Sequence, residues 1–295
     1  MRVLDALTEF CPAKINPYLA VTGKRADGFH DLVSIVAPID VGDTLEVKAR
    51  PAGFRLTCDD PELPTDCDNL VMRAATVFCE MSGWTGGAEF HLRKRIPSGA
   101  GLGGGSSDAV GALRGLNTLS GGLLDAEALH AAAAAVGSDC PLFLSAGPVV
   151  IRGRGERVEA DAPIAAKLRN RELLVLKPGF GVNTAWAYRE MASQAPAAYL
   201  PAGAVAADIS RWREAKLDPT DLGFNSFTAV VGRKFPAIPA MVQRLQAEFG
   251  VALHLSGSGS ACFVWLDAGI DGAAVEQQVR DGWGPEIWTA RARCC

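Results

Sequence analysis

The chain has 295 residues, of which 48% are hydrophobic and 21% are charged. This composition is typical of a globular protein, excludes wholesale disorder and, at roughly 150 residues per domain, predicts two domains. The 33 acidic residues outnumber the 29 basic ones and give a net charge of −4. The chain as a whole therefore does not attract nucleic acid, although residues 91–95 (HLRKR) form a local basic patch.

No apolar run approaches the roughly 20 residues that span a membrane, and Asp5 and Glu9 stand where a signal peptide would be apolar. We expect a cytoplasmic protein with no membrane and no nucleic-acid partner. The eight cysteines include no CxxC pair, which predicts reduced thiols that are mostly buried as small hydrophobic side chains. The adjacent Cys294 and Cys295 are expected to be exposed.

The first half of the chain alternates strand and helix patterns. A helix is predicted at 69–82 because apolar residues recur on one face, with Asp68 or Asn69 as its cap and Gly83 as its stop. The other predicted elements are strands at 17–22, 43–49 and 88–96, helices at about 108–119 and 125–136, and a hairpin at 148–159.

The strand pattern breaks near 160–170, which predicts domains at 1–165 and 166–295. The second domain is expected to be a ferredoxin-like α/β sandwich, so the fold class is α+β. Its predicted elements are strands at 173–178, 251–256, 261–266 and 286–291, helices at 184–193 and 271–281, and a helical pattern over 220–249.

A glycine-rich loop lies between the strand at 88–96 and the helix that follows. Five glycines within 99–105 free the backbone N–H groups to point at an anion, and the following helix N-terminus favours phosphate. We therefore predict a phosphate-binding loop with these residues: Pro97, Ser98, Gly99, Ala100, Gly101, Leu102, Gly103, Gly104, Gly105, Ser106 and Ser107.

The loop differs from the common nucleotide-binding motifs. The chain contains no Walker A sequence and no protein-kinase HRD or DFG, and about 90 β-rich residues precede the loop, which is unlike a Rossmann domain. The string GLGGGSSDA, residues 101–109, resembles the phosphate loop of the GHMP kinases. That resemblance implies ATP as the cofactor, with an N-terminal ribosomal-S5-domain-2-like domain and an active site between the domains.

Six further stretches carry a narrower resemblance: PAKIN (12–16), GKRADGFH (23–30), GSDCP (137–141), GRGE (153–156), KPGFGVNT (177–184) and SGSGSAC (256–262). Together they resemble the 4-diphosphocytidyl-2-C-methyl-D-erythritol kinases, one family of GHMP kinases. Two departures are visible: Ser226 follows Asn225 where that family commonly has aspartate, and Phe29 stands where it more often has tyrosine.

The resemblance implies Asp139 as the base that accepts a hydroxyl proton, and Lys14 as a cation beside it. The residues alone favour a different interpretation, with Asp139 as the N-cap of the next segment and Lys14 as a solvated lysine at a strand edge. Asn16 shares a strand face with Lys14 and is expected to orient the substrate. Mg²⁺ is implied by ATP chemistry, with the hydroxyl of Ser107 as its candidate ligand.

The resemblance also implies an acceptor site in which Phe29 and Tyr188 sandwich a cytosine and His30 bonds its edge. The alternative for the first two residues is a hairpin turn in which Phe29 lies in the core and His30 hydrogen-bonds to a nearby residue. The alternative for Tyr188 is a tyrosine on the surface of an amphipathic helix. Thr184, Gly257 and Ser258 complete the implied acceptor site, where the 256–260 segment is otherwise a plain hairpin.

The expected function is transfer of the γ-phosphoryl group of ATP to the 2-hydroxyl of 4-diphosphocytidyl-2-C-methyl-D-erythritol, a step of non-mevalonate isoprenoid synthesis. The partners are thus ATP and a cytidine-diphosphate-linked polyol, and the chain is expected to be a monomer or weak homodimer. Two alternatives stay open: a GHMP kinase for homoserine, mevalonate or a sugar, and a nucleotide-binding protein that has lost catalysis.

Overall fold

The structure is a computed structural model that describes residues 5–214, 216 and 218–295. Its contacts divide into two compact units: unit 1 from Met1–Ala13, Gly42–Ser98 and Gly103–Ala146, and unit 2 from Lys14–Val41, Gly99–Leu102 and Gly147–Cys295. Strands β1 (Ala6–Lys24) and β2 (His30–Arg50) each contribute residues to both units. No single cut of the chain separates these contact units, and the domains at 1–165 and 166–295 stay a prediction.

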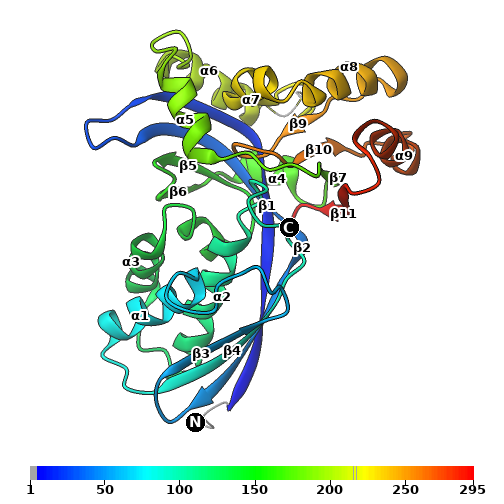
Figure 1. The fold of residues 1–295 in the computed structure, drawn as a ribbon. Helices are drawn as coiled ribbons and strands as arrows, with labels where there is room; N and C mark the ends of the chain where they lie inside the picture. Colours follow the sequence, from blue (N-terminus) through cyan, green and yellow to red (C-terminus); the bar gives the residue numbers. More distant parts are fainter. Residues whose placement is uncertain (1–4, 215, 217) are drawn as a thin grey trace. The chain divides into compact units, whose positions relative to one another are not determined.

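Unit 1 packs helices on a sheet. Strand β4 (Gly87–Arg93) runs antiparallel to β2 from Thr44 to Arg50, and β3 (Phe54–Cys58) runs parallel to β4. Figure 1 shows α1, α2 and α3 gathered on one side of these strands, and the helices contact one another. Their bounds are Leu70–Ser82 for α1, Gly104–Leu119 for α2 and Ala126–Val136 for α3, followed by a 3₁₀ turn, η1, at Pro141–Leu144.

Local sequence signals explain where the helices of unit 1 begin and end. The side chain of Asn69 accepts a hydrogen bond from the N–H of Val71 and caps α1, which ends at Gly83 in the left-handed region with φ 68°. Asp125 caps α3 in the same way. Helix α2 begins at Gly104, earlier than the predicted residue 108, because Gly103 supplies the left-handed φ of 75° before it.

Unit 2 contains residues of β1 and β2 and a separate antiparallel sheet. Around β1 and β2, β5 (Val149–Gly153) pairs with β2 and with β6 (Arg157–Ala160), and β8 (Phe224–Asn225) pairs with β1. The separate sheet has the order β11-β7-β10-β9. Its strands are β7 (Glu172–Lys177), β9 (His254–Leu255), β10 (Cys262–Trp265) and β11 (Trp288–Arg293).

The helices of unit 2 differ in part from the sequence prediction. Helix α4 fills the predicted break at 160–170, and α6 lies where no helix was expected. The helical pattern over 220–249 divides into α7 and α8 at Phe235-Pro236, because proline cannot continue the preceding helix. The bounds are α4 (Ala162–Leu168), α5 (Thr184–Ala192), α6 (Ala202–Arg213), α7 (Phe227–Lys234), α8 (Ala237–Phe249) and α9 (Gly272–Trp283).

The cysteines are free thiols, and four of them are buried. Cys295 is exposed as expected, but the expectation for Cys294 is wrong. Its backbone bridges to Ile39 of β2 and its N–H donates to Arg171, so the tail is held in unit 2. Among the helices that the described residues form, none is both long and apolar enough to cross a bilayer.

Candidate functional site

The middle of the glycine loop is anchored in unit 2 by its carbonyl oxygens. The carbonyl of Gly101 accepts hydrogen bonds from Lys14 Nζ at 2.7 Å and from Ser256 Oγ at 3.1 Å. The carbonyl of Ala100 accepts the backbone N–H of Ala261, and the carbonyl of Leu102 accepts that of Lys14. Because these contacts use the carbonyl oxygens of Ala100, Gly101 and Leu102, they do not occupy the N–H groups of those three residues, which can donate to an anion.

Glycine is required at the centre of this anchor. The φ angle of Gly101 is +81°, and a Cβ there would lie 2.4 Å from the carbonyl oxygen of Ser256. A second glycine, Gly257, approaches the anchor from the 256–261 turn, and a Cβ on it would lie 3.2 Å from Lys14 Nζ. These close approaches explain why glycine recurs in both segments.

Lys14 is a buried cation of unit 2, with only 4% of its surface exposed. Its Nζ donates to Asn16 Oδ1 at 2.6 Å, which confirms that the two side chains share a face of β1. Asn16 in turn donates to Ser34 Oγ at 2.9 Å, so the amide is oriented from both sides. The alternative of a solvated lysine at a strand edge is therefore wrong.

Asn225 and Ser226, where the chain departs from the family pattern, have structural roles. The side chain of Asn225 donates to the carbonyls of Leu255 and Gly257, each at 2.8 Å, and holds the 256–261 turn. Ser226 Oγ accepts the N–H of Val21 at 3.0 Å. The hydroxyl of Ser226 thus has a structural role, because it satisfies a backbone donor of β1.

An aromatic cluster surrounds His30 in unit 2. Its ring stacks on Tyr188 with centroids 4.8 Å apart, and Tyr188 meets Phe227 edge to face. His30 Nε2 lies 3.2 Å from the hydroxyl of Tyr199. Burial lowers the pKa of His30, and the charge of Lys24 adds to the effect. Tyr188 lies on α5 and is half-buried, with its ring packed against His30 and Phe227. His30 finds its hydrogen-bond partner far away in sequence.

Phe29 lies outside the core. Its side chain is 51% exposed, so the alternative that buries it is wrong. The guanidinium of Arg154 lies 4.6 Å from the centroid of the ring. The turn itself is closed by Asp27, whose carboxylate accepts the N–H of Phe29. The hairpin therefore presents an aromatic face at the surface of unit 2.

Two further predicted acceptor residues meet at the start of α5. Thr184 Oγ1 and Ser258 Oγ lie 2.8 Å apart, so the structure joins the first residue of α5 to the 256–261 turn. This turn also connects the antiparallel strands β9 and β10, as the plain hairpin alternative expected. The hairpin and the close approach to the glycine loop are thus both present.

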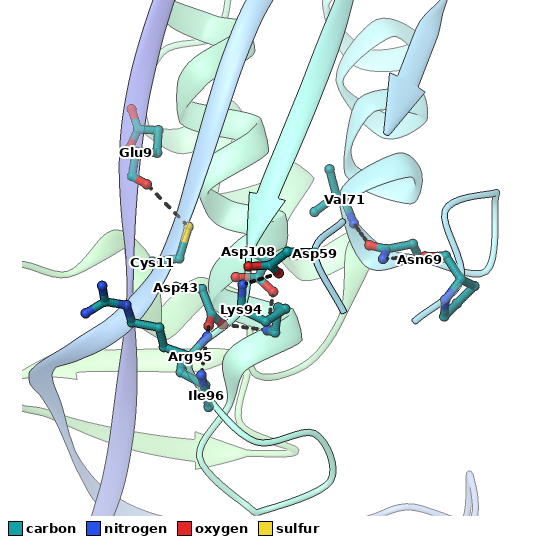
Figure 2. A network of polar contacts seen from close by, with 11 residues as sticks. Glu9, Cys11, Asp43, Asp59, Asn69, Val71, Lys94, Arg95, Ile96 and Asp108 are labelled. Atoms are coloured by element: carbon teal, nitrogen blue, oxygen red, sulfur yellow. Dashed lines mark hydrogen bonds and ion pairs between the residues drawn. The ribbon is translucent and has the colours of Figure 1, made fainter. Parts of the chain in front are cut away.

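Unit 1 holds the helical end of the loop, where Ser107 and Asp108 are almost fully buried. Ser107 Oγ has no hydrogen-bond partner among the described residues. Figure 2 shows Asp108 beside Lys94 and Asp43. Burial raises the pKa of Asp108 to about 7; Lys94 opposes the rise and Asp43 adds to it. Lys94 belongs to the predicted basic patch, but it points inward between these two carboxylates and contributes no surface charge.

Asp139 lies half-buried in the turn between α3 and η1, within unit 1. The N-cap of η1 is Cys140, so the alternative that makes Asp139 a cap is wrong. Lys14 and Asp139 are described in different units, and their common role stays a prediction. Across the described ranges, no group of three or more histidine, cysteine or acidic side chains could hold a metal ion.

Comparison with known proteins places the chain in a family. Residues 69–147 match the model of the GHMP kinases N-terminal domain, and residues 203–284 match that of the GHMP kinases C-terminal domain. A 4-diphosphocytidyl-2-C-methyl-D-erythritol kinase of Synechococcus sp. (strain CC9902) is 41% identical over 87% of this chain and 86% of its own. The chain belongs to the 4-diphosphocytidyl-2-C-methyl-D-erythritol kinase family.

Solved structures of this family and its superfamily agree with the fold. The crystal structure of a 4-(cytidine 5'-diphospho)-2C-methyl-D-erythritol kinase superposes with a TM-score of 0.78 at 32% identity, covering 98% of this chain and all of its own. The Methanococcus jannaschii mevalonate kinase, at 14% identity, covers 100% of both chains and has a TM-score of 0.76, which shows the fold alone. The predicted α+β GHMP kinase fold is confirmed.

Sequence reasoning missed two features of the site. Tyr199, the partner of His30, lies in a segment without a motif, and no local signal points to it. Lys94 was noted only as part of a basic run. A lysine just before a glycine loop, with acidic residues at 43 and 108, is a pattern that becomes visible once the strands are paired.

Proposed function

We propose that the chain transfers the γ-phosphoryl group of ATP to the 2-hydroxyl of 4-diphosphocytidyl-2-C-methyl-D-erythritol, producing ADP and the 2-phosphate in non-mevalonate isoprenoid synthesis. The relatives to which the chain is similar over most of their length are named as this kinase. The observation that carries the proposal to this chain is the buried Lys14, hydrogen-bonded to the glycine loop at Gly101 and to Asn16.

The proposed chemistry needs one proton acceptor and one cation. As the acceptor oxygen attacks the γ-phosphorus, its proton passes to the carboxylate of Asp139, and the bond to the β,γ-bridging oxygen breaks to release ADP. The ammonium of Lys14 counters the negative charge on the attacking oxygen. Asn16 holds that ammonium in place through the hydrogen bond to its Oδ1.

The residues fit a magnesium ion at the helical end of the loop. Ser107 Oγ is buried without a hydrogen-bond partner in the described chain, and a hydroxyl is an oxygen ligand of the kind that Mg²⁺ accepts. Ser107 would therefore hold the ion together with phosphate oxygens and water. Bound there, the ion would neutralise part of the phosphate charge.

The acceptor is assigned to unit 2. The exposed ring of Phe29 offers a face on which the cytosine can stack, worth about 1–3 kcal/mol. Tyr188 is assigned to the other face of the base, and His30 to its polar edge. Thr184, Gly257 and Ser258 are assigned to the polyol diphosphate, because the first and last already share a hydrogen bond.

The test is an assay of ADP release with each candidate acceptor in turn. We expect turnover with the cytidine-linked polyol, inhibition by CDP or CMP, and no turnover with homoserine, mevalonate or galactose. Turnover with one of the other alcohols, unaffected by CDP, would contradict the assigned acceptor, and no ADP release with any of them would contradict the kinase activity itself.

Two variants test the assigned roles of the acid and the amine. Asp139→Asn and Lys14→Met should each lower kcat by about 10²-fold or more, because proton transfer and charge stabilisation are each worth that much. Circular dichroism and urea unfolding serve as controls for folding. Full activity of Asp139→Asn would remove the proposed base. We also propose that the enzyme works in the cytoplasm. We propose further that it is a monomer or weak homodimer, and sedimentation of the purified chain tests this oligomeric state.

A further inference from the structure

We propose that Asp43, Lys94 and Asp108 form a buried clamp that holds both unit 1 ends of the glycine loop and thereby sets the affinity for ATP. The three residues are called the loop clamp below. This inference rests on the proposed function, because it assigns ATP to the loop. It makes the three residues positioning residues, since they act through the backbone of the loop.

The entry of the loop is held by Asp43 of β2. One carboxylate oxygen accepts the backbone N–H groups of Arg95 at 2.5 Å and Ile96 at 2.8 Å. The other oxygen accepts Lys94 Nζ at 2.5 Å. Asp43 therefore fixes the three residues that lead directly into Pro97, where the loop begins (Figure 2).

The exit of the loop is held by the same lysine. Lys94 Nζ donates to Asp108 Oδ2 at 2.8 Å, and Asp108 is the fifth residue of α2. The first helical residue also lies against the clamp, because a Cβ on Gly104 would be 3.3 Å from Asp43 Oδ2. One ammonium thus ties the residues before the loop to the helix after it.

Burial makes this arrangement demanding. The side chains of Lys94, Asp43 and Asp108 are 9%, 0% and 3% exposed. Two carboxylates share one ammonium, so removal of the lysine would leave two buried acids without a counter-charge, and at least one of them would have to take up a proton. Burying three charged groups costs desolvation free energy, so stability alone is a weak reason for this cluster. A role in fixing the backbone of the glycine loop explains it better.

The expected consequence concerns ATP and not the chemical step. Phosphate binds to N–H groups only where the backbone already points them inward, and a loop released at one end would have to be ordered on binding. The Michaelis constant for ATP should therefore rise, while kcat and the Michaelis constant for the acceptor change little.

The experiment compares Lys94→Met and Asp43→Asn with the unmodified chain. We expect the Michaelis constant for ATP to rise roughly tenfold or more, with kcat within about threefold. Lys94→Arg, which keeps the charge, should recover part of the affinity. The matched control is Glu9→Gln, which breaks an ion pair at 3.0 Å between β1 and Arg114 in the middle of α2. It should lower stability without changing the Michaelis constant for ATP.

Binding of a non-hydrolysable ATP analogue, followed by calorimetry, separates this inference from the proposed function. If the unmodified chain binds the analogue but phosphorylates no acceptor, the proposed kinase activity is contradicted. The loop clamp is then tested by the affinity of the variants for the analogue alone. Unchanged affinity in folded Asp43→Asn and Lys94→Met would overturn the clamp. An equal loss of affinity in Glu9→Gln would also overturn it, because general loosening would then explain the effect. If Lys94→Met does not fold, Asp43→Asn alone decides.

Discussion

Gly99 and Gly101 form a matched pair that tests how the glycine loop is anchored. Both have φ in the left-handed region, at +62° and +81°. A Cβ on Gly99 would meet nothing within 4 Å, whereas one on Gly101 would lie 2.4 Å from the carbonyl oxygen of Ser256 and 3.1 Å from that of Gly259. Alanine at either site is strained, but only at Gly101 does it also collide with backbone.

The two substitutions should therefore differ in cost. Gly99→Ala incurs only the left-handed penalty of about 1–2 kcal/mol. Gly101→Ala adds a displacement of packed backbone, which typically costs about 1–3 kcal/mol more. It also shifts the carbonyl that receives Lys14 Nζ and Ser256 Oγ. The sum is about 2–5 kcal/mol in the free energy of unfolding.

Urea unfolding and steady-state kinetics check this difference. Gly101→Ala should lose at least about 1 kcal/mol more stability than Gly99→Ala, and its kcat should fall further because Lys14 is displaced with the loop. Equal losses in the two variants would refute the reasoning, since they would mean that the turn at 256–261 does not confine the loop.

Three further outcomes follow from buried groups. Burial lowers the pKa of His254 to about 4, whereas in the unfolded chain this side chain takes up its proton near 6.5. The free energy of unfolding should therefore fall by up to ~3 kcal/mol as the pH drops from about 6.5 to 4. Urea unfolding of His254→Leu should show a smaller loss of stability at acid pH, and a pH profile identical to that of the unmodified chain would contradict this. Tyr199→Phe removes the partner of His30 and should raise the Michaelis constant for the acceptor about fivefold, with that for ATP as the unchanged control. Ser107→Ala should raise the Mg²⁺ concentration needed for half activity without lowering thermal stability, because its buried hydroxyl has no partner in the described structure; an unchanged Mg²⁺ requirement would remove Ser107 as a ligand.

Much of the secondary structure was readable from short-range signals. The cap at Asn69, the stop at Gly83 and the cap at Asp125 are local hydrogen bonds or φ requirements, and the helices predicted around them are present. The start of α2 was misplaced because glycine disfavours a helix in isolation. Here the glycines of its first turn are tolerated, since a larger side chain at Gly104 would crowd Ile96 and Asp43.

The environment of each candidate residue was less predictable. Lys94 looked like part of a solvated basic run, and its burial depends on acids that lie 51 and 14 residues away in the chain. Phe29 looked equally suited to a core, but the turn at Gly28 leaves it exposed. Such outcomes depend on which strands pair and which helices cover them.

The amino-acid order by itself determined the glycine loop, the helix ends and the order of the family motifs, because turn conformation and capping involve neighbouring residues. Only the tertiary structure decided that Lys14 is buried and donates to Gly101, 87 residues away, and that His30 stacks on Tyr188. Those contacts exist because folding removes the side chains from water, where a lysine gains nothing from a distant carbonyl, and confines them where each polar atom needs a partner.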